Sequence, residues 1–447
     1  MTENPHQTTL DTALTESGLE AVNWTFPDAD TQYLTHGLHN YPARMVPQIP
    51  DRLLSYYLDE GVLEEGDVVY DPFSGSGTTA VEARRHDLNA EANDINPLAV
   101  LLTRAKSIPL DPEEVEAAQT TLLDGLKSRL ADVESQYEAG EPIDVEEPAV
   151  RDGWFPEPQL TQLAVIRDRI DDLEREYDQA LARFFRVALS HTTRKVSYQR
   201  NGEYKRYRLS EEDREDHDPD VYPIFEQKVR ENVSMMKDYS RETSRDQQTQ
   251  VHYADSREAA DVEDDSVDIV ITSPPYGDHG TTVAYGQFSQ DPAIVSWGRE
   301  YDEMREVDKT GLGGSNRVLE PLEEIEEWSE ALSATLETLR EKDGRSDDAM
   351  EFFRDYYAVM EQVKRVLKPG QPVAWVVANR TMSRVNIPTH LITQQLCEHL
   401  GFELTHMLPR EIPNKTLPWE NAPENQPGVK GDLMANENIV VMTAPEE

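Results

Sequence analysis

The sequence of 447 residues contains a single cysteine, Cys397. One thiol cannot form an intrachain disulfide or a multi-cysteine zinc site, and the sequence indicates no other metal site. Long apolar runs are also absent: PLAVLL and PVAWVVA fall far short of the ~18 residues that a membrane span needs. The first residues, MTENPHQTTLDTALTESG, lack the basic start and the apolar core of a signal peptide. We therefore expect a soluble, cytoplasmic protein.

Positive charge is scarce. The chain carries 43 Lys and Arg against 87 Asp and Glu, a formal net charge of -44. The acids are spread over most of the chain, which argues against a disordered acidic tail. Self-repulsion of this size is tolerable where salt screens it, because the Debye length falls to about 3 Å near 1 M. We interpret the acidity as adaptation to a salty cytoplasm, such as that of a halophilic archaeon, with a nonspecific solvated surface as the alternative.

The stretch DIVITSPPYGD, residues 268–278, combines a strand pattern with a stiff loop. Ile269 to Thr272 form an uninterrupted apolar or β-branched run, which is typical of a strand buried on both faces. Pro274 and Pro275 then end the ladder because neither can donate a backbone hydrogen bond. The loop would hold a hydroxyl, a carbonyl and an aromatic ring at the rim of a sheet. An ordinary strand end is the alternative.

Residues 66–102 predict a βαβ unit. A short strand from Val68 to Tyr70 leads through Gly75 and Gly77 into a helix near Thr78, and a second strand leads to Asp94. The next helix opens at a proline, residue 97, where the missing N–H does no harm. Such a unit favours a parallel sheet covered by helices, with a glycine turn that lets the backbone approach a ligand.

The turn reads G-x-G-x-x-A, and the later Asp94 suits a carboxylate that accepts hydrogen bonds from ribose hydroxyls. A nicotinamide cofactor would also fit this pattern. A phosphate-binding P-loop would not, because no lysine follows Gly77. A plain tight turn stays open as well.

Taken together, DPFSGSGTT, NDINPLA and SPPYG resemble the amino-methyltransferases that modify exocyclic nitrogens of DNA bases with S-adenosyl-L-methionine. The likeness extends to residues 39–58, 251–270, 352–380 and 437–444. It implies an α/β fold with a Rossmann-like methyltransferase sheet, helices on both faces and mainly helical insertions. The implied core spans residues 1–106, 251–278 and 349–447. Residues 107–250 and 279–348 would be insertions, the second a possible target-recognition region.

The resemblance also implies the site residues. It places five residues around the methionine part of the cofactor: Asp71, Phe73, Gly75, Gly77 and Thr78. It places Asp94 at the ribose and Asp255 at the adenine amino group. Catalysis would fall to the SPPY loop, Ser273, Pro274, Pro275 and Tyr276. For each acid, a helix cap or a turn is the alternative role.

The chemistry explains the SPPY loop. An exocyclic amine is a poor nucleophile because its lone pair is delocalised into the ring. Ser273 Oγ and the Pro274 carbonyl could hold both amine hydrogens and draw the nitrogen toward a tetrahedral shape, while Tyr276 stacks on a base taken out of the duplex. Ring-carbon methylation would need a cysteine nucleophile, and Cys397 lies in an amphipathic helical stretch without a neighbouring proline. We expect it to pack in the core.

The first insertion contains an apolar stripe at near-helical spacing, which predicts packing against the core. Its members are Leu160, Leu163, Ile166, Ile170, Leu173, Tyr177, Leu181 and Phe184. Residues 183–208 then hold eight Lys or Arg and one acid, Glu203. Cations interleaved with Tyr198, Tyr204 and Tyr207 are typical of a nucleic-acid contact surface, and internal ion pairs are the alternative. The cations in question are Arg194, Lys195, Arg200, Lys205, Arg206 and Arg208.

Two other segments are candidate DNA contacts. The segment after SPPY is rich in Thr, Tyr, Gln and Trp and could line the groove on the target side. Asn414, Lys415 and Trp419 stand in a proline-rich stretch within residues 410–439.

The sequence therefore predicts a site-specific DNA methyltransferase that binds double-stranded DNA, with a cognate restriction endonuclease as a candidate partner. In the family, Ser before the two prolines more often marks cytosine-N4 enzymes, whereas Asp or Asn more often marks adenine-N6 enzymes, so Ser273 favours cytosine N4. Adenine N6, RNA and a protein glutamine are the alternatives, followed by an NAD-dependent oxidoreductase and a catalytically inactive nucleic-acid-binding protein.

Overall fold

A computed structural model describes residues 18–200, 202, 205–259, 261–277, 283–315, 324–342, 344–412 and 436–446. Its strands are β1 Val68–Asp71, β2 Asn89–Asp94, β3 Thr249–Tyr253, β4 Ile269–Thr272, β5 Pro372–Ala378, β6 Arg380–Met382, β7 Val385–Ile387, β8 Glu403–Glu411 and β9 Asn436–Thr443. Its helices are η1 Leu19–Ala21, η2 Leu34–Leu38, α2 Gln48–Asp59, α3 Thr78–Arg85, α4 Pro97–Ser107, α5 Pro112–Leu123, α6 Leu126–Ala139, α7 Gln159–Glu176, α8 Gln179–Val196, α9 Glu211–Glu215, α10 Val221–Glu242, α11 Tyr285–Trp297, α12 Tyr301–Thr310, α13 Ile325–Trp328, α14 Glu330–Glu341, α15 Ser346–Val366 and α16 Thr389–His399.

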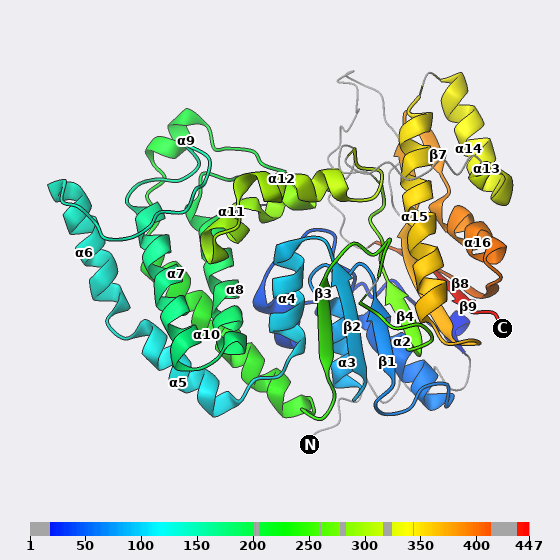
Figure 1. Cartoon of the computed structure of the whole chain (residues 1–447), viewed down its shortest axis with the longest axis horizontal. Helices are drawn as coiled ribbons and strands as arrows, with labels where there is room; N and C mark the ends of the chain where they lie inside the picture. The colour runs from blue at the N-terminus through cyan, green and yellow to red at the C-terminus, as the bar shows by residue number, and fades with distance from the viewer. Residues whose placement is uncertain are drawn as a thin grey trace.

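Seven strands form the central sheet in the order β3-β2-β1-β4-β5-β9-β8 (Figure 1). The first five pair in parallel, and β9 is antiparallel to both of its neighbours, β5 and β8. Strands β6 and β7 form a separate hairpin. The predicted α/β fold with a mainly parallel Rossmann-like sheet is confirmed, and the parallel strands bring the ends of β1, β2 and β4 to the same edge.

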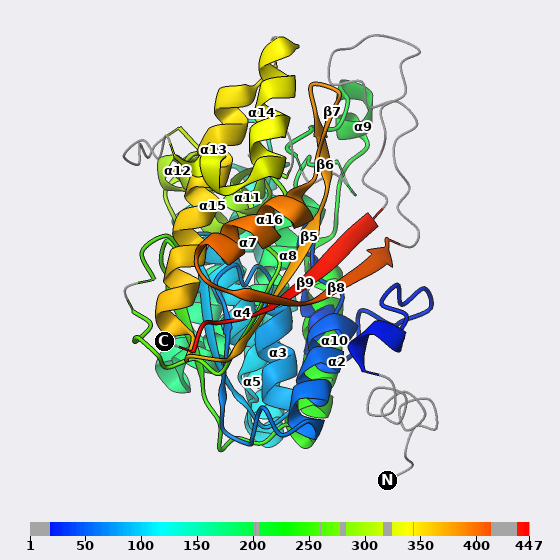
Figure 2. The same cartoon turned by 90° about the vertical axis from the view of Figure 1, so that its right-hand side faces the viewer.

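Alternate residues of each strand face two helical layers. Val69, Ile269 and Ala374 pack with residues of α2 and α3 on one face, whereas Tyr70 and Val270 pack with residues of α15 and α16 on the other. Figure 2 shows α15 and α16 on one side of the sheet and α2 and α3 on the other. All four residues of β4 are buried, as expected of an apolar run in the middle of a sheet.

The local predictions for the βαβ unit are confirmed. Helix α3 begins at Thr78, and α4 begins at Pro97, where the Asn96 side chain accepts a hydrogen bond from the Leu98 amide at 3.1 Å. Cys397 is fully buried in α16, which confirms its role in the core.

Helices α5 to α10 form a mainly helical body beside the β3 edge (Figure 1). The predicted apolar stripe is confirmed as core. It belongs to two helices, because α7 ends just before Tyr177 and α8 begins just after it. Most of α8, including Phe184 and Phe185, is buried in the same cluster. The start of the 183–208 segment is therefore core, and its exposed part begins near Lys195. No helix in the described ranges has the length and apolarity of a membrane span.

Candidate active site

The glycine turn after β1 is shaped by close packing. Gly77 has φ +83°, and a Cβ there would lie 2.8 Å from the Thr103 Cα of α4, so any side chain would push α3 and α4 apart. Gly75 also has a positive φ, of +50°, and its amide donates to Asp94 Oδ2 at 2.9 Å. The turn therefore holds the ends of β1 and β2 together at the sheet edge.

Two buried carboxyl groups lie at this edge. Asp71 Oδ1 accepts from the Thr272 hydroxyl at 2.6 Å and from the Phe73 amide at 3.0 Å. Asp94 Oδ1 accepts from the Asn96 amide at 2.8 Å. Burial raises the pKa of Asp71 to about 6 and that of Asp94 to about 7, where the nearby Asp71 adds to the effect. The hydrogen-bond donors around both groups are neutral, so the site is suited to a ligand that brings positive charge.

Both carboxyl groups line a hollow with about 1090 Å³ of empty space, part of it open to solvent. Six of the seven predicted cofactor residues line it: Asp71, Phe73, Gly75, Thr78, Asp94 and Asp255. Gly77 does not, because its role is to let α3 and α4 pack.

Other lining residues come from two segments distant in sequence. Tyr41 to Met45, which belong to the 39–58 segment of the family resemblance, line one side, and the Tyr41 ring stacks on Tyr285 at 5.8 Å between centroids. Residues 307–312, at the end of α12, line another side. The 279–348 insertion was expected only on the target side, so this contribution to the cofactor side is a new finding. The glycines in TGLGGS were the one sequence signal of a close backbone approach.

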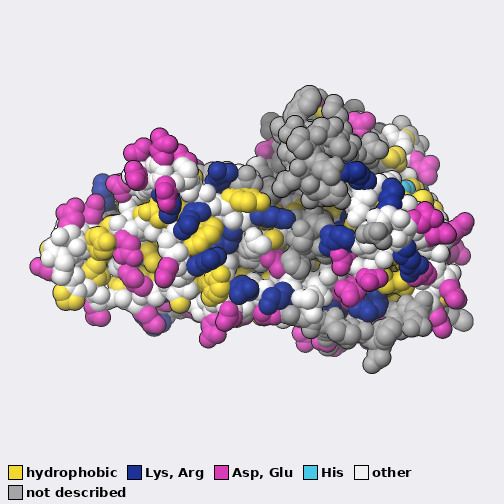
Figure 3. All heavy atoms as spheres, turned by 90° about the horizontal axis from the view of Figure 1, so that it is seen from above, with side chains coloured by type: hydrophobic (Ala, Val, Ile, Leu, Met, Phe, Trp, Pro, Cys, Tyr) yellow, Lys and Arg dark blue, Asp and Glu magenta, His cyan; other side chains and the backbone are white. Residues whose placement is uncertain are grey.

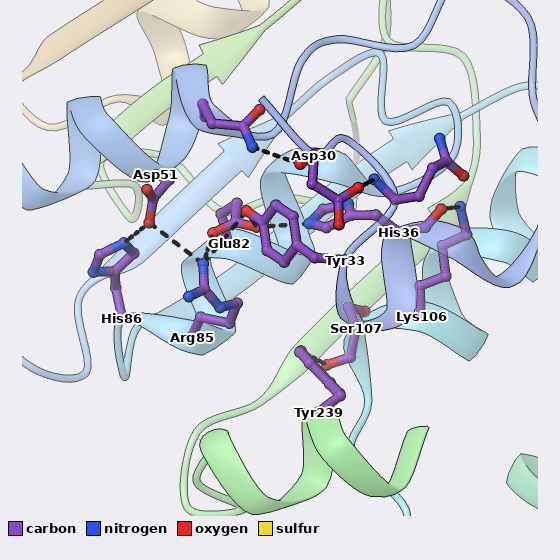
Figure 4. A network of polar contacts seen from close by, with 12 residues as sticks. Asp30, Tyr33, His36, Asp51, Glu82, Arg85, His86, Lys106, Ser107 and Tyr239 are labelled. Atoms are coloured by element: carbon purple, nitrogen blue, oxygen red, sulfur yellow. Dashed lines mark hydrogen bonds and ion pairs between the residues drawn. The ribbon is translucent and has the colours of Figure 1, made fainter. Parts of the chain in front are cut away.

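The segment that leads to Tyr41 is fixed by a buried polar network (Figure 4). His36 Nε2 and the Tyr33 hydroxyl both contact Glu82 Oε1 of α3, each at 2.6 Å. Arg85 also pairs with Glu82 and lies 3.4 Å from Asp51, so its positive charge lies between these two acids. The network holds η2 against α3, and residues 39–45 leave η2 toward the hollow.

The SPPY loop reaches the same hollow from β4, which ends at Thr272 as predicted. Ser273 and Pro275 line the hollow, whereas Pro274 and Tyr276 do not. The Ser273 and Tyr276 hydroxyl oxygens lie 3.3 Å apart, and Tyr276 donates to Glu437 Oε1 of β9 at 2.9 Å. At Gly277 the guanidinium of Arg380 lies so close that a Cβ would be 1.4 Å from it, so any larger residue there would have to displace the buried Arg380 side chain. Ser273 and the two carboxyl groups therefore face one shared space.

Comparison with known proteins identifies the family of this chain. A family model described as DNA methylase, for N6 and N4 enzymes, matches residues 5–105. The type II methyltransferase M.MvaI of Kocuria varians is 32% identical over 438 residues, covering 93% of this chain and 92% of the relative. The chain belongs to the DNA amino-methyltransferases of the N4/N6 family.

Two more distant likenesses cover less of the chain. The type II methyltransferase M.MjaII of Methanocaldococcus jannaschii is 32% identical over 91 residues, 20% of this chain and 16% of the relative. A solved structure of a DNA modification methylase from Thermus thermophilus, complexed with S-adenosyl-L-methionine, is 18% identical, covers 43% of this chain and 54% of that chain, and superposes with a TM-score of only 0.22.

As a DNA amino-methyltransferase, the enzyme acts on DNA and uses S-adenosyl-L-methionine. The lining of the hollow suits this cofactor, because buried carboxyl groups complement a ligand of net positive charge, whereas the diphosphate of NAD would bring like charge. The nicotinamide alternative therefore has no support. The residues that would hold the cofactor are those that line the hollow at β1, β2 and the glycine turn.

Asp255, the residue predicted at the adenine amino group, is held by Arg257. The guanidinium donates to both Asp255 oxygens, to Asp355 Oδ2 at 2.6 Å and to the Thr310 carbonyl at 2.6 Å. Asp355 in turn accepts from the Gly313 amide at 2.9 Å. Asp255 thus lines the hollow while Arg257 ties it to the end of α12.

The predicted nucleic-acid contacts separate into two groups. Arg194, Lys195 and Arg200 line a second hollow of about 1330 Å³, which shares Arg44 and Thr78 with the first. On this side the methyltransferase presents positive charge next to the first hollow.

The second group lies elsewhere. Arg206 is mostly buried, 3.0 Å from Asp291 and 3.9 Å from the Trp154 ring centroid, and Arg208 donates to the Gly153 carbonyl at 3.0 Å. For Arg206 the internal ion pair, the alternative considered from the sequence, is what the structure shows. Lys205 is partly buried and lines neither hollow. Tyr204, Asn414, Lys415 and Trp419 lie outside the described residues.

Proposed function

We propose that this enzyme transfers the methyl group of S-adenosyl-L-methionine to N4 of cytosine in duplex DNA. The observation that carries the proposal is that Ser273 lines the same hollow as Asp71 and Asp94. A base presented to the SPPY loop would then meet the cofactor in one shared hollow. Adenine N6 is the second candidate, because both amines are planar and can donate two hydrogens to the same acceptor pair.

The loop would activate the amine by position and electrostatics. Ser273 Oγ accepts one amine hydrogen and the Pro274 carbonyl accepts the other, which turns the nitrogen lone pair away from the ring. When bound, the cofactor supplies an electrophilic methyl group. Pro274 and Pro275 keep the two acceptors from rotating, and the end of β4, buried on both faces, gives the loop a rigid base.

A base must leave the duplex to reach this loop. The Tyr276 hydroxyl is held by Glu437, which keeps the tyrosine ring at the SPPY loop, where we predict that it stacks on an extruded base. Arg194, Lys195 and Arg200 in the adjoining hollow would hold the phosphates of the same strand. A cognate restriction endonuclease stays a prediction.

Ser273→Ala tests the catalytic part of the proposal. Loss of one preorganised polar partner should lower turnover by about 10- to 1000-fold. Affinity for the cofactor should stay nearly the same, because Asp71 and Asp94 are untouched. Transfer of labelled methyl groups to DNA and calorimetry with S-adenosyl-L-methionine measure the two quantities. Unchanged turnover would remove Ser273 from the reaction.

A further inference from the structure

A chain of polar contacts runs from the SPPY loop into the edge of the sheet. It starts with Ser273 and Tyr276, whose hydroxyl oxygens lie 3.3 Å apart, and continues at 2.9 Å to Glu437 Oε1. The other Glu437 oxygen accepts from Arg410 Nη1. Neither Glu437 nor Arg410 was a candidate in the sequence, because no short motif links them to the loop.

Only one direction of hydrogen-bond donation is consistent along this series of contacts. Arg410 can only donate and an ionised carboxylate can only accept, so Tyr276 must donate its proton to Glu437. The Tyr276 oxygen is then left to accept, and the contact at 3.3 Å is satisfied when Ser273 donates to it. Burial raises the pKa of Tyr276 well above its ordinary value, with Glu437 adding to the effect, so the phenol keeps the proton that this order needs.

We propose that Tyr276 and Glu437 are positioning residues that turn the Ser273 hydroxyl proton away from the target amine and so present Ser273 Oγ as a pure acceptor. The proposal rests on the proposed role of Ser273. A free serine hydroxyl rotates and can point its proton in any direction. A proton aimed at the amine would oppose an N–H donor, so a fixed direction makes the acceptor ready before the base arrives.

Glu437 and Arg410, at the far end of this series of hydrogen bonds, are held well enough to orient the Tyr276 hydroxyl. Glu437 of β9 and Arg410 of β8 stand opposite each other in the antiparallel register, and both are buried. Arg410 also donates through Nε to the Trp24 carbonyl at 3.0 Å. Both charges are therefore fixed by strand pairing on a regular part of the sheet, which limits movement of the Tyr276 hydroxyl.

Two substitutions separate this role from simple support of the loop. Tyr276→Phe keeps the ring but removes the hydroxyl, so kcat should fall by about 10-fold or more. The KM for DNA and the affinity for the cofactor should not change. If Tyr276 acts through Ser273, the double variant with Ser273→Ala should be no slower than Ser273→Ala alone.

Glu437→Gln keeps the size of the side chain but should reverse the direction of hydrogen-bond donation between this residue, Tyr276 and Ser273. Because Arg410 only donates, the amide oxygen should turn to Arg410 and the amide nitrogen to Tyr276, which would then donate to Ser273. The Ser273 proton would point at the amine, and kcat should fall at least as far as in Tyr276→Phe. Glu403→Gln, on the exposed end of β8, is the matched control and should leave kcat unchanged.

The results distinguish failure of this proposal from failure of the catalytic site. Wild-type kcat in Tyr276→Phe, or equal effects of Tyr276→Phe with and without Ser273→Ala, would overturn the positioning role while Ser273 stays catalytic. Wild-type kcat in Ser273→Ala would overturn both. Circular dichroism and cofactor calorimetry show whether each variant is folded. If Glu437→Gln does not fold, the Tyr276 and Ser273 cycle still decides.

Discussion

At the scale of single residues, the proposed cofactor site contains two acids whose carboxyl groups are buried, so their ionised forms are disfavoured. Burial raises the pKa of Asp94 to about 7 and that of Asp71 to about 6. Near neutral pH, part of the Asp94 population would therefore be protonated before the cofactor binds. A cofactor with positive charge binds the ionised form, so binding and proton release are coupled.

Asp94→Ala should weaken binding of S-adenosyl-L-methionine by about 1.5 to 3 kcal/mol, the scale of a hydrogen bond to a charged group. In the parent enzyme the affinity should rise as pH increases through about 7, because Asp94 loses its proton in that range. Asp94→Asn should flatten this rise, whereas Asp59→Asn at the exposed end of α2 should not. Calorimetry over roughly two pH units around that value measures both effects. A pH profile in Asp94→Asn identical to the parent's would place the titrating group elsewhere.

Residues of the site could be predicted from the sequence where they lie in short local motifs. The glycine turn, Asp71, Asp94 and Ser273 each follow a strand or end one within a few positions, so strand ends alone place them at one edge of a parallel sheet. Glu437 could not be predicted, because its contact with Tyr276 joins residues 161 positions apart. Arg257 was missed for a similar reason, since its partner Asp355 belongs to α15.

At the scale of elements, helix α8 shows why a charge pattern is an incomplete guide. Its residues alternate between core and surface, so only the cations at and after its last turn lie at the second hollow. The sequence shows the same eight cations as one run. Burial assigns Arg206 to the ion pair with Asp291 and leaves Lys195 and Arg200 exposed. Which cations are exposed and which form internal ion pairs depends on how α11 packs against α8, and a local sequence pattern does not show that packing.

Replacing Lys195 and Arg200 with Ala should lower affinity for DNA and reduce the slope of log affinity against log salt by about 0.9 per lost phosphate contact. Cofactor affinity and thermal stability should stay the same. Arg206→Ala should instead destabilise the fold by about 3 kcal/mol, because it leaves Asp291 buried without its partner. Fluorescence titrations with DNA at several salt concentrations and chemical denaturation measure these effects. Arg175→Ala, on the exposed face of α7, is the control for loss of one positive charge.

An unchanged salt slope in the Lys195 and Arg200 variant would contradict the assignment of the second hollow to DNA. A stable Arg206→Ala variant that binds DNA weakly would exchange the roles of the two groups.

At the scale of the whole molecule, positive charge is concentrated where the chemistry needs it. The chain has a net charge of -44, yet Figure 3 shows dark-blue Lys and Arg side chains gathered along the middle of the face above the sheet edge, with Asp and Glu toward its ends. DNA would meet this face with its negative backbone directed to the middle. The parallel sheet was predictable from the βαβ unit, but the antiparallel insertion of β9 between β5 and β8 was not, because it follows from pairing over long range.

The nucleosides of DNA that the purified enzyme has treated with S-adenosyl-L-methionine test the central claim most directly. Digestion to nucleosides and mass spectrometry should show N4-methylcytosine as the main product, and the Ser273→Ala variant should show about 10- to 1000-fold less of it in the same time. N6-methyladenine as the sole methylated nucleoside would contradict the assignment to cytosine.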